Sequence, residues 1–131
     1  MSVNTRRFGW FLVLFIFFIF ALDAGNLYWG WQRHVSWFDS PMHFLGGAWV
    51  TLASIWFFTT HRGNHPFNQR FFYALTALFV ISVFWEAYEA FFNFLRSGLW
   101  TFNATDTAKD LFCNYLGAIL AIYFTKQYVK Q

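Results

Sequence analysis

The sequence predicts an all-α integral membrane protein, a four-helix bundle that forms a single transmembrane domain over residues 1–131. Hydrophobic residues make up 58% of the chain and charged residues only 11%, whereas about a quarter of an ordinary soluble domain is charged. The apolar runs approach the roughly 20 residues that a helix needs to cross a bilayer. They are also continuous and do not alternate as the strands of a membrane barrel do. The connections are short, so neighbouring helices are expected to be antiparallel.

The predicted transmembrane helices cover residues 8–28, 41–60, 71–94 and 107–128. The first follows a basic pair and resembles a signal peptide, but it lacks a good cleavage pattern, and we interpret it as a signal anchor. Ser40 is the expected N-cap of the second helix, with Pro41 in the first turn. A polar loop precedes the third helix. At the fourth, Thr107 and Asp110 fit a capping box in its Asp form.

The basic residues predict the orientation of the bundle. If the helices alternate in direction, six of the nine Lys and Arg residues fall on one side of the membrane: Arg6, Arg7, Arg62, Arg70, Lys126 and Lys130. Cytoplasmic loops carry an excess of such residues, so the N- and C-termini are predicted to be cytoplasmic. The expected location is a bacterial inner membrane. The net charge of +3 reflects this asymmetry, and no basic run indicates nucleic-acid binding.

All acidic side chains fall in the outer half of the predicted bundle: Asp23, Asp39, Glu86, Glu89, Asp106 and Asp110. Their spacing of three or four residues places those of each helix on one face. Asp39 shares its face with His43, and Asp110 shares its face with Asn114. Since every helix carries its polar face at the same depth, we expect these faces to converge inside the bundle.

This convergence predicts a polar site for a divalent cation, a polar lipid headgroup, or both. A charge at the centre of a bilayer costs about 2.5–3.5 kcal/mol, so Glu86 and Glu89 must share protons, pair with a cation or meet water. Carboxylate and imidazole groups suit Mg, Ca, Mn or Zn. The expected metal ligands are His43, Glu86, Glu89 and Asp110, supported by Asp39, Asp106, Asn114 and Asp23.

A structural interpretation of the same residues remains open. Asp39 and Asp106 can be interfacial residues at helix starts, and Asp110 can be a capping acid. His43 can donate to a backbone carbonyl, and Asn114 can bridge two helices. The chain would then be a structural or accessory membrane subunit, with other membrane proteins or a second copy of itself as partners and lipids around it.

The residue pattern gives less support to other functions. Proton or ion conduction through the glutamates lacks a matching acidic chain in the cytoplasmic half. No second histidine pairs with His43 across the membrane, so no haem is expected. Cys113 is the single cysteine and cannot form an internal disulfide. A metal-dependent hydrolase or transferase acting on lipid-linked phosphate stays open, although no nucleophile motif is present.

Three motifs in order resemble the VanZ-like and YjdF-like small bacterial membrane proteins. They are residues 37–47 with Asp39-x-x-x-His43-Phe44, residues 84–89 with two glutamates, and Asp106-x-x-x-Asp110-x-x-x-Asn114-x-x-Gly117. The resemblance covers roughly residues 37 to 121. VanZ is associated with glycopeptide (teicoplanin) resistance, so the resemblance implies a role in the cell envelope. This chain has Glu-x-x-Glu where the VanZ pattern has Glu-x-x-Gln.

Overall fold

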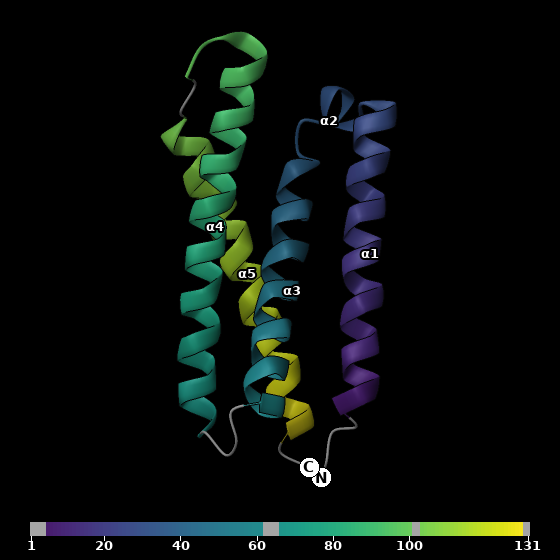
Figure 1. The fold of residues 1–131 in the computed structure, drawn as a ribbon, viewed down its shortest axis with the longest axis vertical. Helices are drawn as coiled ribbons and strands as arrows, with labels where there is room; N and C mark the ends of the chain where they lie inside the picture. The colour runs from purple at the N-terminus through teal and green to yellow at the C-terminus, as the bar shows by residue number, and fades with distance from the viewer. Residues whose placement is uncertain (1–4, 62–65, 101–102, 130–131) are drawn as a thin grey trace.

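The computed structural model describes residues 5–61, 66–100 and 103–129, and it shows an all-α bundle (Figure 1). The four long helices are α1 (Thr5–Trp29), α3 (Asp39–His61), α4 (Phe67–Ser97) and α5 (Ala104–Val129), and a short helix, α2 (Trp31–His34), joins α1 to α3. No strand occurs in these three stretches. The predicted all-α fold is confirmed, and each predicted helix lies within one of the long helices.

Two glycines end helices in the left-handed conformation. Gly30 has a φ of 66° and Gly98 a φ of 71°, values that an L side chain rarely adopts. The Gly30 N–H donates to the Asn26 carbonyl over 2.7 Å, and the Gly98 N–H donates to the Phe94 carbonyl over 2.8 Å. These glycines therefore close the last turns of α1 and α4.

The start of α3 differs from the prediction. The helix begins at Asp39, so Ser40 and Pro41 both lie in its first turn, and Ser40 is not the N-cap. Proline is tolerated there because the first N–H groups of a helix have no intrahelical partner.

The start of α5 also differs from the prediction. The Asn103 side-chain oxygen accepts hydrogen bonds from the backbone N–H groups of Thr105 and Asp106, over 3.2 and 3.4 Å. Asn103 is therefore the cap. The capping box expected at Thr107 and Asp110 is wrong, because the helix starts a turn earlier and leaves both side chains available for tertiary contacts.

Helix α3 is the centre of the bundle. It packs most extensively against α5 and also contacts α4 and α1. Figure 1 shows α3 between α1 and α4, with α5 crossing behind it. Two small apolar clusters fill the interior, one of Val50, Leu78 and Ala118 and the other of Ile55, Ala74 and Ile122.

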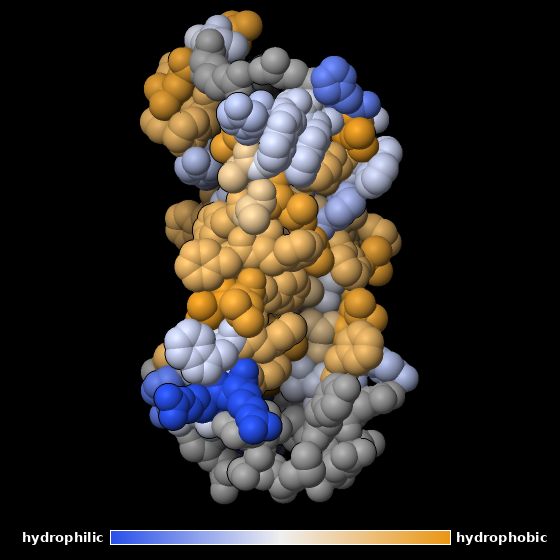
Figure 2. Space-filling model, turned by 90° about the vertical axis from the view of Figure 1, so that its right-hand side faces the viewer, coloured by the Kyte–Doolittle hydropathy of each residue, from blue (hydrophilic) through white to orange (hydrophobic). Residues whose placement is uncertain are grey.

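The surface of the bundle is that of a membrane protein. In the part of the chain that the structure describes, three helices are long and apolar enough to cross a membrane by length and composition: Thr5–Trp29, Asp39–His61 and Asn68–Leu95. Large apolar side chains are exposed along most of α1 and α4, and Figure 2 shows an apolar belt between two polar ends. Helix α5 does not meet the same criterion, so its predicted span stays a prediction.

The start of α1 and the end of α5 lie at the same end of the bundle (Figure 1), and we call the opposite end the distal end. The basic residues Arg6, Arg7, Arg70 and Lys126 lie toward the termini, whereas all six acidic residues lie in the distal halves of their helices. Arg62 and Lys130 lie outside the described residues. The charge separation follows the predicted pattern, and the cytoplasmic orientation of the termini stays a prediction.

Candidate metal centre

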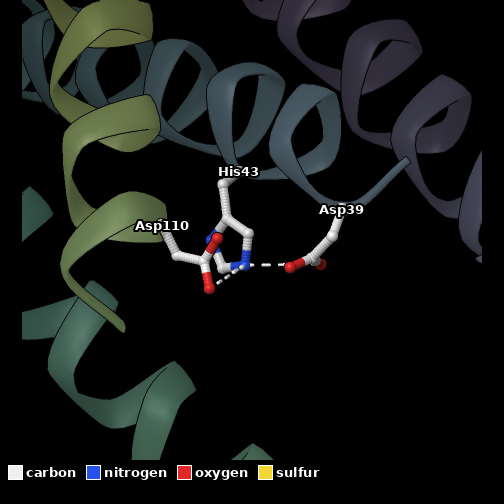
Figure 3. Close-up of side chains that lie close together, drawn as sticks. All are labelled: Asp39, His43 and Asp110. Carbon is white, nitrogen blue, oxygen red and sulfur yellow. Dashed lines mark ion pairs between the residues drawn. The ribbon is translucent and has the colours of Figure 1, made fainter. Parts of the chain in front are cut away.

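The candidate site is built around His43, a buried residue in the first turns of α3 that is 6% exposed. Its Nε2 atom lies 3.5 Å from Oδ1 of Asp39, one turn earlier on the same helix. The same atom lies 3.8 Å from Oδ2 of Asp110, which reaches across from α5 (Figure 3). Both distances exceed the roughly 2.7–3.2 Å of a good N–H···O bond. The imidazole nitrogen is thus flanked by two carboxylates and held tightly by neither.

A second group on α4 approaches the same histidine. One ligand atom each from His43, Glu86 and Glu89 lies within 4.8 Å of the others. The Thr107 hydroxyl donates to Oε2 of Glu86 over 2.7 Å, and the Trp85 indole N–H donates to Oε1 of Glu89 over 3.0 Å. Each glutamate is therefore oriented by one hydrogen bond and keeps its second oxygen for another partner.

The two groups share His43 and together bring five potential ligands from three helices to one place. We call these five residues the polar centre: Asp39, His43, Glu86, Glu89 and Asp110. Two of its oxygens, Oδ1 of Asp110 and Oε1 of Glu86, are buried and accept no hydrogen bond from the described residues. Oδ1 of Asp110 is 3.5 Å from the Lys109 ammonium nitrogen, an ion-pair distance without a close hydrogen bond. Such orphaned buried oxygens indicate a missing partner.

Asn114 lies on the inner side of the polar centre. Its amide nitrogen donates to the Ser82 hydroxyl over 3.1 Å and lies 3.4 Å from Nδ1 of His43. Ser82 belongs to α4, Asn114 to α5 and His43 to α3, and all three are buried. The amide therefore links three helices and fixes the rotation of the imidazole ring.

Two of the predicted site residues lie apart from the polar centre. Asp106 is 54% exposed and pairs with Lys109 over 2.7 Å. Asp23 is half-buried on α1 and belongs to neither ligand group of the described residues. Of the eight predicted residues, five form the polar centre and Asn114 lies next to them. Asp106 and Asp23 lie apart from the polar centre.

Two partners of the glutamates were missed from the sequence. Trp85 and Glu89 are four residues apart, a spacing that puts two side chains on one helix face, and this signal was available. Thr107 was assigned to a capping box, and its contact with Glu86 joins residues 21 positions apart. No local sequence pattern predicts a contact between residues so far apart in the chain.

A cleft opens beside the polar centre, between the distal end of α4 and the start of α5. It has a volume of about 430 Å³ and is lined by Glu86, Glu89, Ala90, Asn93, Trp100, Asn103, Asp106 and Thr107. The glutamates therefore belong both to the polar centre and to the cleft wall.

Comparison with known proteins identifies a family without naming an activity. Neither the curated proteins nor the solved structures include a match to this chain. One family's sequence profile matches residues 4–131, nearly the whole chain. The chain belongs to that family, described as predicted membrane proteins (DUF2238).

Proposed function

We propose that this protein binds one divalent cation at the polar centre, with His43, Asp39 and Asp110 as ligands and Glu86 and Glu89 as further donors. The observation that carries the proposal is the surroundings of Asp110. Its side chain is 3% exposed. One oxygen accepts no hydrogen bond from the described residues, and the other lies too far from an imidazole nitrogen for a good hydrogen bond. A cation between these atoms would satisfy all of them.

The spacing of the ligand atoms supports a shared ion. Two ligand atoms bound to one ion at about 2.1 Å lie about 3.0–3.4 Å apart in octahedral or tetrahedral geometry. The observed separations from Nε2 of His43 are 3.5 Å to Asp39 and 3.8 Å to Asp110. Shifts of a few tenths of an ångström in two carboxylates would therefore complete the coordination.

Charge balance also supports a cation. Among the described side chains, one ammonium group lies near the four carboxylates of the polar centre, that of Lys109, which is 43% exposed and also pairs with Asp106. Removing charges from water without compensation is strongly unfavourable. A divalent ion compensates two of these charges directly, and the imidazole ligand favours Zn or Mn over Mg or Ca.

The biological setting is part of the proposal. The resemblance to VanZ-like and YjdF-like proteins supports a role in the bacterial cell envelope. The predicted orientation would place the distal end, with the cation, at the outer face of the inner membrane. There the ion would be available to polar headgroups of the lipid bilayer.

The test is the metal content of the purified protein, measured by elemental mass spectrometry after exposure to Zn or Mn and removal of unbound ions. We expect near-stoichiometric metal in the wild type and loss in Asp110→Asn and in Glu86→Gln/Glu89→Gln. Asp23→Asn is the matched control, because it removes an acid outside the polar centre, and it should retain the metal. Circular dichroism must show equal helicity, and a wild type without metal would overturn the proposal.

A structural role is the second candidate, and the contacts of Asn114 favour it. A hydrogen-bonded network of His43, Ser82 and Asn114 can fix the packing of three helices without any ion. In that case no metal binds, and replacing Glu86 and Glu89 by Gln leaves the assembled protein unchanged. The same elemental measurement therefore separates the two candidates.

A further inference from the structure

The cleft between α4 and α5 carries an excess of negative charge. Among the side chains that the structure describes, three of its lining residues are acids, Glu86, Glu89 and Asp106, and none is Lys or Arg. Lys109 compensates Asp106 by a 2.7 Å ion pair. The described wall of the cleft therefore carries an excess of negative charge from the two glutamates, which attracts a cationic group and repels an anionic one.

The cleft wall offers hydrogen-bond acceptors from Glu86, Glu89 and Asn93. Oε1 of Glu86 is buried and accepts no hydrogen bond from the described residues. Asn93 continues the face of Glu89 one turn further along α4, and it also lines the cleft. An ammonium group has three N–H donors and no acceptor, so it matches this arrangement.

The cleft also holds an aromatic ring in a fixed orientation. Trp100 lines it, and its ring stacks on that of Phe94 with centroids 4.7 Å apart and planes at 15°. The Trp face attracts a cation more strongly than the faces of other aromatic side chains. Carboxylates together with a tryptophan face form a favourable environment for an organic ammonium.

From these observations we propose that the cleft binds the primary ammonium headgroup of a membrane lipid, an aminophospholipid. The cleft lies at the distal end of a helix that is apolar enough to span a membrane. Exposed Leu95 and Leu99, 60% and 66% exposed, lie close to Trp100 in the chain and suit acyl chains. A volume of about 430 Å³ falls within the usual range of small-ligand sites.

The proposal rests on the proposed metal centre in one respect. Glu86 and Glu89 serve both proposals, as donors near the cation and as carboxylates of the cleft wall. The two proposals differ in their other residues, because Asn93 and Trp100 line the cleft and lie outside both ligand groups of the polar centre.

The test is lipid retention, measured by native mass spectrometry on protein equilibrated with equal amounts of phosphatidylethanolamine and phosphatidylglycerol. We expect the wild type to retain phosphatidylethanolamine in preference to phosphatidylglycerol. When N-acetylated phosphatidylethanolamine, which has no ammonium charge, replaces phosphatidylethanolamine, this preference should disappear. Trp100→Leu should reduce the preference about two- to fivefold, as expected for a lost cation–π contact. Asp23→Asn is the control and should keep it.

Two further measurements distinguish a lipid headgroup from a free amine and the cleft proposal from the metal proposal. Free ethanolamine should not displace the lipid at equal concentration, and displacement would overturn the lipid assignment. Asp110→Asn should lose the metal and keep the lipid preference, which supports the cleft independently of the ion. A wild type that contains metal but retains both lipids equally would overturn the cleft proposal and leave the metal centre standing.

Discussion

Gly47 of α3 lies directly against the backbone carbonyl of Asn114 in α5, so close that a methyl group on Gly47 would overlap the carbonyl oxygen. The contact is reciprocal, because a methyl group on Gly117 would overlap the Phe44 carbonyl. His43 is one turn before Gly47, and Asp110 is one turn before Asn114. The close approach of the two backbones therefore brings imidazole and carboxylate together one turn further toward the distal end.

We expect Gly47→Ala to separate α3 from α5 and to lower the free energy of unfolding by about 1–3 kcal/mol or more. The new methyl group meets backbone atoms, which cannot move aside as a flexible side chain does. Gly46→Ala is the matched control, since nothing lies within 4 Å of a methyl group there. Thermal unfolding in detergent measures the difference, and equal stability of the two variants would contradict the close contact.

Thr107→Val should weaken the attachment of α5 to α4. The variant removes the 2.7 Å hydrogen bond from the Thr107 hydroxyl to Glu86, and loss of a bond to a charged group costs about 1.5–3 kcal/mol. In the control, Thr76→Val, the lost hydroxyl only bonds the carbonyl of Phe72 on its own helix. The free energies of unfolding of both variants provide the measurement. A Thr107 variant as stable as the control would show that the contact contributes nothing.

Helix periodicity predicted the polar centre because its members repeat on helix faces. Spacings of three and four residues placed Asp39 with His43 and Glu86 with Glu89, and the structure brings these faces together. The common depth of the polar faces predicted that they converge, and residues of α3, α4 and α5 do so while Asp23 of α1 belongs to neither ligand group. Periodicity carries no information on how far each face extends toward its neighbour. It therefore could not exclude Asp23, which occupies the same level on a helix that packs mainly against α3.

The start of α5 was beyond the reach of local patterns. Asn103 and Thr107 both precede apolar residues, and each is followed by residues that suit a first helical turn. Tertiary contacts distinguish the two residues. The Thr107 hydroxyl donates a hydrogen bond to Glu86, whereas the Asn103 side chain accepts one from the Thr105 N–H and caps the helix. The cleft could not be predicted either, since it is formed where residues from 86 to 107 meet across a reversal of the chain.

Lys109→Gln should raise the affinity for the divalent cation. The Lys109 ammonium lies 3.5 Å from Oδ1 of Asp110 and competes with an ion for that oxygen. Because Lys109 is 43% exposed, the solvent-screened effect is modest, about two- to fivefold in Kd. Lys126→Gln, at the opposite end of the bundle, is the charge-matched control. Titration with Zn or Mn measures both, and a weaker affinity in Lys109→Gln would argue against Asp110 as a ligand.

The two candidate functions require different orientations of the Asn114 amide. As placed, the amide nitrogen faces Nδ1 of His43, an arrangement in which Nδ1 accepts and Nε2 carries the proton. An imidazole that binds a metal through Nε2 instead carries its proton on Nδ1 and needs an acceptor there. Rotation of the amide by half a turn presents its oxygen to Nδ1–H and leaves Ser82 free to donate to the same oxygen.

Variants of Asn114 therefore test the metal centre through the proton on His43. Asn114→Asp offers an acceptor to Nδ1–H and should retain the metal, whereas Asn114→Leu offers none and should weaken binding about 10- to 100-fold. Metal titration on samples of equal helicity provides the measurement. In a metal-free network the Asp variant instead buries an unpaired charge and is the less stable of the two. Retained metal affinity in Asn114→Leu would show that His43 does not bind the ion through Nε2.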